Sequence, residues 1–376
     1  MKVALVYLSN YKDWPMGGML NYVRNIIPGL YHSKKFDLDI WGGTNGNETQ
    51  CTFQIDGESY FFKRYTSFYT KRKILPNFVI SFFGALFNAQ KFKKYDVIYS
   101  HTAATTIALK LMNPKKIVIH HQHGLSYKET KGIIRILNIG YSIAQLIADV
   151  TLFVASEDEV EQHKKSFIGF QNKDFYSIGS PISFKTIHEA SVGKKENDIL
   201  QFVYCGRIDE WKNIELLVDA FDMFLGEGHE GQLTLIGDGP QLDYIKETIK
   251  KLGREREIFA VGRKNEKEIT QILGKSDIFL FPTKGEGVSL ALLEAFSAGL
   301  PALSFDVVGV KNFVKNGFTG IVVREFDVSH YKDGIVRLGR DYKLYKNNCI
   351  EMARSYDKDH IAQKIEDIII NNTKES

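Results

Sequence analysis

Cysteine is scarce in this chain of 376 residues, which has only Cys51, Cys205 and Cys349, and no two of them form a CxxC pair. We therefore expect no disulfide framework and no cysteine-rich zinc site, and a reducing, cytoplasmic compartment. The N-terminus lacks a long apolar run. Val3–Leu8 is shorter than the core of a signal peptide, and no small-residue cleavage site follows it, so this run predicts a first strand.

Extreme composition is also absent. Hydrophobic residues make up 44% of the chain and charged residues 25%, which excludes a disordered or fibrous protein. No segment is of low complexity, and nothing repeats at the period of a solenoid. At about 150 residues per domain, the length predicts two to three domains.

Acidic residues are missing from one stretch, Ser59–Tyr95, although the whole chain has a net charge of only +4. The basic residues of this stretch are Lys63, Arg64, Lys71, Arg72, Lys73, Lys91, Lys93 and Lys94. Such a block indicates an anionic partner, either a phosphorylated substrate or a membrane surface. Nucleic acid is not expected, because no nucleic-acid-binding motif accompanies the charge.

The same block contains an apolar run, Ile74–Phe87, that is too short for a membrane span. Two interpretations of this run stay open. It is a helix packed on the core of an N-terminal sheet, or a helix that lies on a membrane surface with its basic flanks toward the lipid. The two are compatible if one face packs and the other contacts lipid.

Short apolar runs alternate with helical periodicities along most of the chain, which predicts α/β architecture with doubly wound parallel sheets buried on both faces. The predicted strands are Lys2–Leu8, Asp37–Gly43, Asp96–Ser100, Lys116–His120, Thr151–Ala155, Gln201–Cys205, Gln232–Ile236, Ile258–Val261, Asp277–Phe281, Pro301–Phe305 and Gly320–Val323. Two sheets fit the length, with Phe175–Asn197 as the linker between them. Ligands of such sheets bind beyond the carboxyl ends of the strands, so the residues after each strand are the site candidates.

Two strand-to-helix loops carry phosphate-binding features. Gly17 and Gly18 precede a helix, where paired glycines let the backbone approach a phosphate; the alternative is a plain flexible loop. Arg207 and Lys212 follow the strand that ends at Cys205 and are suited to clamp a diphosphate; the alternative is a pair of solvated surface cations.

The segment 281–301 predicts a helix that opens near Val288 or Ser289 and ends at Gly299. Glu294 lies in this otherwise apolar helix, where an ionised carboxylate needs a hydrogen-bonding partner. Glu286 lies just before the helix, whose free N–H groups suit a phosphate. In the alternative interpretation Glu294 caps a loop and Glu286 faces solvent.

These motifs together resemble the retaining glycosyltransferases of family 4. The resemblance is carried by Gly206-Arg207 with Lys212, by Gly237-Asp238-Gly239-Pro240, by Val261-Gly262, and by Glu286 and Glu294 in E-x7-E spacing. It implies the GT-B fold, in which two Rossmann-like domains face each other across a cleft. Residues 1–185 then form an acceptor-binding domain, 186–350 a nucleotide-sugar-binding domain, and 351–376 a helix that packs back on the first domain.

The resemblance also implies roles. Arg207 and Lys212 bind the donor's diphosphate, Glu294 the ribose, and Glu286 the transferred sugar. The other implied donor contacts are Gly17, Gly18, Gly262, Arg263, Gly287, Val288, Ser289 and Leu290. His123 matches the family's N-domain histidine and joins Glu286, Arg207 and Lys212 in the implied catalytic set, and His101 is a second, strand-end candidate.

The chain departs from the family at three places. Val288 and Ser289 replace the usual Phe and small residue, so the sugar is not inferred. Pro28 is expected to kink or end the first helix near Ile27. Gly179-Ser180-Pro181 stands where the family usually has Asn-Gly.

No metal site is expected. Asp37-Leu38-Asp39 has DxD spacing, but it sits inside a strand pattern that Asp37 starts, so we do not expect it to bind a metal. His120, His121 and His123 suggest zinc at first sight, but adjacent histidines on a strand diverge and no third-ligand pattern is near.

The function implied by the resemblance is a retaining, metal-independent transfer of a sugar from a nucleotide sugar, UDP-linked rather than GDP-linked, to an acceptor hydroxyl. The implied acceptor is a lipid-linked glycan of bacterial surface polysaccharide synthesis. The expected location is cytoplasmic, with contact to the inner membrane face through 59–95 left open, and no cofactor is expected besides the donor. The alternatives are a GT-B sugar-nucleotide epimerase and a catalytically silent GT-B partner subunit.

Overall fold

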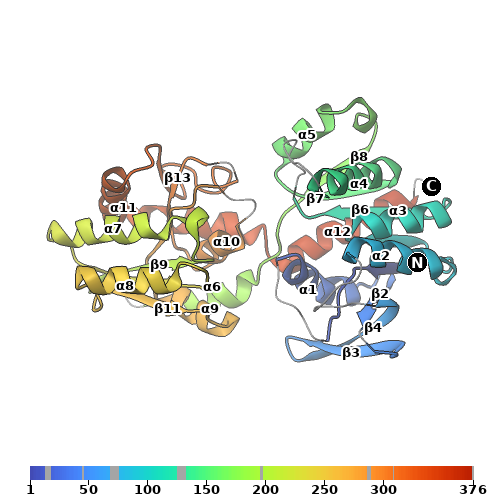
Figure 1. Cartoon of the computed structure of the whole chain (residues 1–376), viewed down its shortest axis with the longest axis horizontal. Coiled ribbons are helices and arrows are strands. Elements are labelled where there is room, and N and C mark those ends of the chain that lie inside the picture. The colour runs from blue at the N-terminus through green and yellow to red at the C-terminus, as the bar shows by residue number, and fades with distance from the viewer. Residues whose placement is uncertain are drawn as a thin grey trace. The chain divides into compact units, whose positions relative to one another are not determined.

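The computed structural model describes residues 1–12, 18–44, 46–67, 76–124, 133–194, 198–285, 289–307 and 309–374 (Figure 1). The chain forms two compact units: unit 1 is Met1–Pro181 with Lys358–Ser376, and unit 2 is Ile182–Asp357. Compared with the division drawn from the sequence, 182–185 and 351–357 belong to unit 2. The chain crosses from one unit to the other twice, after Pro181 and after Asp357.

Unit 1 is built on a sheet with the order β3-β4-β2-β1-β5-β6-β7-β8. Its strands are β1 (Lys2–Val6), β2 (Asp37–Thr44), β3 (Gln50–Ile55), β4 (Glu58–Ser67), β5 (Val97–Ser100), β6 (Ile117–Gln122), β7 (Val150–Val154) and β8 (Asp174–Ile178). All neighbouring strands pair in parallel except β3, which pairs antiparallel to β4. The parallel strands β1, β5, β6 and β7 are buried along nearly their whole length, as their continuous apolar runs predict.

The helices of unit 1 are α1 (Gly18–Tyr31), α2 (Asn77–Phe87), α3 (Ala103–Met112), α4 (Ile133–Ile147), α5 (Glu157–Lys165) and α12 (Lys358–Lys374), with 3-10 turns η1 (Ala89–Phe92) and η2 (Ile168–Phe170). Helix α1 connects β1 to β2 on one side of it in the sheet, whereas α3 and α4 connect β5 to β6 and β6 to β7 in the opposite direction. Because such crossovers are right-handed, α1 lies on the opposite face of the sheet from α3 and α4. Helix α2 packs on α3, and α12 packs beside α1 (Figure 1).

Unit 2 is built on a fully parallel sheet with the order β11-β10-β9-β12-β13-β14. Its strands are β9 (Leu200–Cys205), β10 (Gly231–Ile236), β11 (Ile258–Gly262), β12 (Ile278–Phe281), β13 (Ala302–Phe305) and β14 (Gly320–Val323). Its helices are α6 (Phe184–Ser191), α7 (Ile214–Gly226), α8 (Leu242–Leu252), α9 (Glu266–Lys275), α10 (Leu290–Ser297) and α11 (Val328–Arg354), with the 3-10 turn η3 (Glu210–Lys212). Together these elements enclose one hydrophobic core.

Three features of unit 1 differ from the sequence-based expectations. Helix α1 runs through Pro28 to Tyr31, because Ile27 and Leu30 are fully buried on either side of the proline and the backbone hydrogen bond from His32 N to Pro28 O continues the last turn. The hairpin β3–β4 was not predicted, since β4 lies mostly within the basic block and the alternating pattern of β3 was not recognised. Strand β8 and helix α6 occupy most of the expected linker Phe175–Asn197.

The basic block forms several elements. Its first part is β4, where Lys63 Nζ lies 2.6 Å from Asp39 Oδ2, and Lys94 Nζ lies 3.6 Å from the same oxygen. Lys71, Arg72 and Lys73 lie outside the described residues. Helix α2 packs one face on the core, where Ser81 and Ala85 are buried, and leaves other side chains exposed; contact of that exposed face with lipid stays a prediction. Among the described residues, no helix is long and apolar enough to cross a bilayer.

A glycine in unit 2 is required by a close approach of two loops. Gly237 has a φ of +147°, and an added Cβ would overlap the carbonyl oxygen of Gly206. The same loops are joined by hydrogen bonds from Gly206 N to Ile236 O and from Ile208 N to Asp238 O, each 3.0 Å long. The substitution Gly237→Ala is therefore expected to lower the free energy of unfolding by about 2–4 kcal/mol, measured by thermal or urea unfolding.

The matched control is Gly226→Ala at the end of α7, where an added Cβ meets open space. This change is expected to be neutral or to stabilise by up to about 1 kcal/mol, because alanine favours the helix. Equal stability of the two variants would contradict the close approach.

Candidate functional site

The order of the unit 2 sheet reverses between β9 and β12, which lie side by side in its middle. In open parallel sheets the carboxyl edge at such a reversal is where ligands bind, since the two flanking loops diverge to opposite faces and leave a crevice. The loops after β9 and β12 contain most of the donor-binding residues implied by the sequence. We therefore treat this edge as the candidate site of unit 2.

The loop after β9 is organised by Asp209. One carboxylate oxygen, Oδ1, accepts hydrogen bonds from the backbone N–H groups of Trp211 (3.1 Å) and Lys212 (3.2 Å), which caps the turn η3. The other, Oδ2, lies 3.0 Å from Arg207 Nε. A single carboxylate therefore holds both predicted diphosphate-binding residues on one short loop.

The two cations differ in their surroundings. The Arg207 side chain is 69% exposed. Lys212 is half-buried, with its Nζ 6.0 Å from the centre of the Phe281 ring at the end of β12. The loops after β9 and β12 are also joined through Trp211 O, which accepts hydrogen bonds from Lys284 N (2.9 Å) and Thr283 Oγ1 (3.4 Å). Lys212 therefore lies at the junction of the two strands.

Helix α10 begins where the sequence predicted. Ser289 is its N-cap, and its hydroxyl accepts a hydrogen bond from Leu292 N at 3.3 Å. The unbonded N–H groups of the first turn give this end of the helix a positive partial charge. Glu286, Gly287 and Val288, which precede the cap, lie outside the described residues.

Among the described carboxyl groups of unit 2, Glu294 has the most strongly shifted pKa. Burial raises its pKa to about 7, and the negative charge of Glu266 adds to the effect. The Glu294 charge in turn adds to burial in raising the pKa of Cys205, the last residue of β9, to about 12. Within the described part of the chain, no side chain forms a hydrogen bond or ion pair with the Glu294 carboxylate.

Gly262, the last residue of β11, and Arg263, which follows it, are the predicted nucleobase contacts and lie two strands away from β9. Gly262 has a φ of +70°, and its carbonyl accepts a hydrogen bond from Gly237 N at 3.0 Å. Arg263 is exposed. These residues thus flank the site on its β11 side, beyond the group formed by Arg207, Lys212 and Glu294.

Unit 1 brings three histidines together at the carboxyl edge of its own sheet. The rings of His101, His121 and His123 stack with centroids 4.8–5.4 Å apart. His101 Nδ1 lies 3.1 Å from His123 Nε2, so one imidazole donates its N–H to the other. The Tyr22 ring of α1 packs edge-on against both His121 (4.7 Å) and His123 (4.9 Å).

Burial keeps this histidine cluster neutral. It lowers the pKa of His123 to about 3, with a further contribution from His120, and lowers the pKa of His101 well below its usual value. His120 points away from the cluster and pairs with Thr106 Oγ1 at 2.9 Å. Neutral imidazoles act as hydrogen-bond donors and acceptors toward hydroxyl groups and carry no charge of their own.

Of the remaining predicted donor contacts, Gly17 lies outside the described residues, Gly18 is the first residue of α1, and Leu290 is the first residue of α10. No group of three His, Cys, Asp or Glu side chains forms a candidate metal site within the described ranges.

Sequence reasoning missed several residues of these sites. Asp209 could have been found from the sequence. An Asp at the start of a helical turn typically caps it, because its carboxylate accepts hydrogen bonds from backbone N–H groups two and three residues later. Trp211, Thr283 and Tyr22 carried no such signal, because their positions depend on which loops and helices the topology brings together.

Comparison with known proteins decides the fold. Unit 2 matches the family model of "Glycosyl transferases group 1" over residues 184–356. The lipopolysaccharide outer core galactosyltransferase WaaB superposes with a TM-score of 0.71 at 18% identity, covering 99% of this chain and 100% of that one. The fold is GT-B. A sucrose-phosphate synthase from Thermosynechococcus elongatus has the same fold, with a TM-score of 0.74 at 18% identity over the full length of both chains.

Several curated relatives are named glycosyltransferases. The chain is 24% identical over 76% of its length, and 78% of the relative's, to "UDP-Gal:alpha-D-GlcNAc-diphosphoundecaprenol alpha-1,3-galactosyltransferase" of Escherichia coli. It is 26% identical over 47% of both chains to "N-acetyl-alpha-D-glucosaminyl L-malate synthase" of Bacillus anthracis. The expected GT-B fold is thus confirmed, and the family match covers almost exactly the residues of unit 2.

Proposed function

We propose that this GT-B protein is a retaining, metal-independent glycosyltransferase that moves a sugar from a UDP-sugar to an acceptor hydroxyl. One observation carries the proposal: the carboxyl edge between β9 and β12 gathers Arg207, Lys212 and the half-buried Glu294. Two cations suit a diphosphate, and a carboxylate held in a mostly buried position suits the hydroxyls of a ribose. A nucleoside diphosphate sugar contains both groups.

Each residue of this edge has a proposed task. Arg207 and Lys212 bind the diphosphate, and Glu294 accepts hydrogen bonds from the ribose. The first turn of α10 supplies N–H groups to the donor, and Gly262 with Arg263 lies against the base. Glu286 binds the transferred sugar, and unit 1, with His123, takes the acceptor side of the reaction. UDP is supported by the names of the Escherichia coli relative and of a GT-B structure, Anabaena HepE, that was solved with UDP (TM-score 0.71, 16% identity).

The proposed chemistry is a front-face substitution. The bond between the sugar's anomeric carbon and the diphosphate oxygen breaks, and the acceptor oxygen bonds to that carbon from the same face. The acceptor's proton passes to the departing diphosphate, so no protein nucleophile is needed. The main contribution of the protein is electrostatic, because Arg207, Lys212 and the N-terminus of α10 stabilise the negative charge that grows on the diphosphate.

The proposed acceptor is a lipid-linked glycan, with the protein acting in the cytoplasm at the inner membrane face. The name of the Escherichia coli relative specifies a sugar on diphosphoundecaprenol as its acceptor, which supports this class. The test is a panel of nucleotide sugars screened for thermal stabilisation, followed by transfer to a diphosphate-linked lipid acceptor and determination of the product's anomeric configuration. Inversion, or interconversion of the sugar nucleotide without an acceptor, would refute the proposal.

The metal requirement is tested separately. The cationic pair can neutralise the diphosphate in the way that a metal ion does in other transferases. We therefore expect turnover to be unchanged by EDTA, within about two-fold in kcat, in the assay with the best donor. Complete loss of activity that manganese restores would show that the cations alone are not sufficient.

A further inference from the structure

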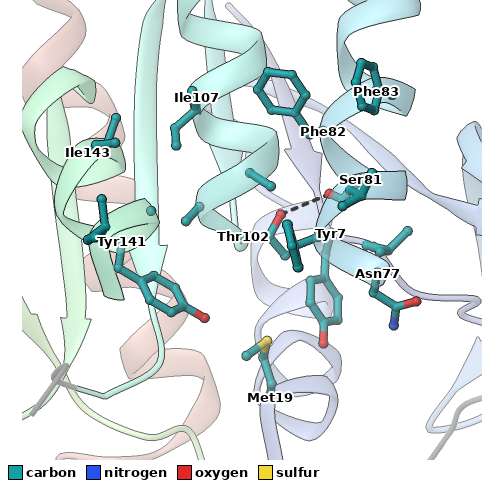
Figure 2. Close-up of a pocket in the computed structure, with 17 residues that line it drawn as sticks. Tyr7, Met19, Asn77, Ser81, Phe82, Phe83, Thr102, Ile107, Tyr141 and Ile143 are labelled. Atoms are coloured by element: carbon teal, nitrogen blue, oxygen red, sulfur yellow. Dashed lines mark hydrogen bonds between the residues drawn. The ribbon is translucent and has the colours of Figure 1, made fainter. Parts of the chain in front are cut away.

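Helix α2 borders two hollows of unit 1 that differ in charge. One is an apolar groove of about 600 Å³ between α2, α3 and α4, and no charged side chain lines it among the described residues (Figure 2). The other, which we call the basic hollow, has a volume of about 540 Å³ and lies between the β3–β4 hairpin, the end of α2 and the turn η1. Lys63, Arg64 and Lys91 line the basic hollow, and no aspartate or glutamate does so within the described part of the chain. The basic hollow is therefore the one that suits an anion.

Arg64 is held in position by neutral partners. Its Nε donates a hydrogen bond to Thr66 O at 3.3 Å, and its Nη2 donates one to Ser67 Oγ at 3.0 Å. Arg64 is half-buried, yet no carboxylate of the described residues forms an ion pair with it. A cation that is partly removed from water usually has a carboxylate partner, because an opposite charge offsets the cost of lost hydration. An anionic ligand would supply this missing counter-charge.

The chemistry of the two unpaired cations indicates phosphate. An arginine has five N–H donors, and the two hydrogen bonds of Arg64 leave others for the oxygen atoms of a ligand. A guanidinium group binds the oxygen atoms of a phosphate in pairs, and an ammonium group binds them as a point charge. Lys91, which is exposed on η1, adds this second charge to the same hollow. A phosphate monoester carries a charge of about −1.5 to −2 at neutral pH, so it matches two cations better than a carboxylate does.

Lys63 strengthens the positive potential without being free itself. Its Nζ lies 2.6 Å from Asp39 Oδ2, and Lys94 Nζ lies 3.6 Å from the same oxygen. Two ammonium groups thus share one carboxylate, and a net positive charge remains beside the hollow. This charge raises the local concentration of anions, whereas Arg64 and Lys91 are left to contact the ligand directly.

The remaining lining argues for a phosphate ester over a free phosphate ion. A hollow of about 540 Å³ is much larger than the ion and lies within the range of roughly 300–1,000 Å³ that is typical of small-molecule sites. Thr49 and Gln50, before and at the start of β3, line it with a hydroxyl and an amide group. Phe87 lines it with a ring that is 79% exposed. These side chains suit the hydroxyl and carbon groups of a polyol attached to the phosphate.

We propose that the basic hollow binds the phosphate group of a polyol phosphate ester, with Arg64 and Lys91 as its direct ligands. The site lies within unit 1 and uses none of the residues assigned to the sugar donor, so it does not depend on the proposed function. A soluble phosphate ester and a phospholipid headgroup present the same chemical group. The experiment therefore has one arm for each source.

The first arm measures the binding of glycerol phosphate to the full chain by calorimetry, with glycerol as the uncharged probe. Glycerol phosphate is expected to bind, and glycerol is not. Arg64→Gln should weaken binding about ten-fold or more, because it removes hydrogen bonds between charged groups. Lys91→Gln should weaken it about three-fold, as for an exposed ion pair.

Lys115→Gln is the matched control for the loss of a lysine charge. Lys115 is exposed between α3 and β6 and lines neither hollow, so its variant should keep the wild-type affinity. Thermal unfolding checks that each variant is folded. Lys91→Gln changes an exposed side chain, so it keeps the proposal testable if Arg64→Gln is unstable.

The cations of the unit 2 site also attract phosphate, so the measurement is repeated on the double variant Arg207→Gln/Lys212→Met. Binding that this variant keeps and Arg64→Gln weakens supports the basic hollow. Binding that the double variant loses and Arg64→Gln keeps overturns the proposal, and UDP affinity measured in parallel still tests the unit 2 site by itself.

The second arm uses vesicles of phosphatidylcholine with and without phosphatidylglycerol, whose headgroup also contains glycerol and phosphate. If only vesicles with phosphatidylglycerol bind and Arg64→Gln releases them, the phosphate belongs to a lipid headgroup. If glycerol phosphate binds through Arg64 and these vesicles do not, the ligand is a soluble ester. If Arg64→Gln and Lys91→Gln change neither kind of binding, the proposal is wrong.

Discussion

Lys212→Met is expected to lower kcat/KM for the sugar donor by about 10²–10³-fold, the usual cost of removing one group that stabilises developing charge. Methionine keeps the apolar stem that lies near Phe281 and removes only the ammonium group. Arg207→Gln should cost less, because the Arg207 side chain is mostly exposed and already paired with Asp209. Steady-state kinetics with the donor identified by the panel measure both effects.

Lys246→Met is the control for charge removal on unit 2. Lys246 is exposed on α8, away from the loops after β9 and β12. Its loss should leave kcat/KM within about two-fold, as for most surface substitutions. If Lys246→Met and Lys212→Met lower kcat/KM equally, the net charge of unit 2 affects the donor. The proposal that Lys212 binds the diphosphate directly is then wrong.

The sequence was informative wherever a strand is buried on both faces. The predicted strands of unit 2 correspond to β9 through β14 within one residue at each end, because continuous apolar runs between turn residues have few other solutions. The sequence was not informative at the edge of unit 1, where β3 and β4 are exposed on one side and β4 lies mostly within the basic block. Helix α1 passes Pro28 because tertiary burial outweighs one lost hydrogen bond, which local sequence does not reveal.

Sequence reasoning found the site residues that follow predicted strands and missed the groove that depends on the packing of distant helices. Arg207, Lys212 and Glu294 were found because each follows a predicted strand in one unit, and the structure gathers them at one sheet edge. Their roles stay predictions. The apolar groove was out of reach of sequence reasoning, since it needs the packing of three helices separated in sequence by 15 residues or more. The apolar run of α2 gave a partial signal, namely that one face of this helix had no partner in the core.

Glu294→Gln and Glu286→Gln are expected to change different kinetic parameters of the reaction. Glu294 is proposed to hold the ribose, which does not change during the reaction, so its loss removes uniform binding and raises the donor KM. Loss of a hydrogen bond to a charged group weakens UDP binding by about 10–10²-fold. Glu286 is proposed to contact the reacting sugar, so Glu286→Gln should keep UDP affinity and lower kcat by about 10²–10³-fold.

The raised pKa of Glu294 adds a stability effect with a defined sign. The carboxyl group has a pKa near its ordinary value of 4.5 in the unfolded chain and about 7 in the folded one. Between these values the folded state binds the extra proton, so the stability of the wild type falls as the pH rises from about 4.5 to 7 and levels off above. Glutamine does not titrate, so the stability of Glu294→Gln does not fall over this pH range.

Glu294→Gln is therefore expected to be more stable than the wild type at pH 8, by about 1–3 kcal/mol, and similar to it at pH 5. Thermal unfolding over this pH range measures the gap, and calorimetry with UDP measures the affinity. Only the ionised carboxylate accepts both ribose hydrogen bonds, so the wild type's advantage in UDP affinity should grow as the pH rises through about 7. A variant that is more stable at pH 8 and binds UDP as tightly as the wild type would show a strained buried acid with no role toward the ribose. Loss of UDP binding in Glu286→Gln but not in Glu294→Gln would reverse the two assignments.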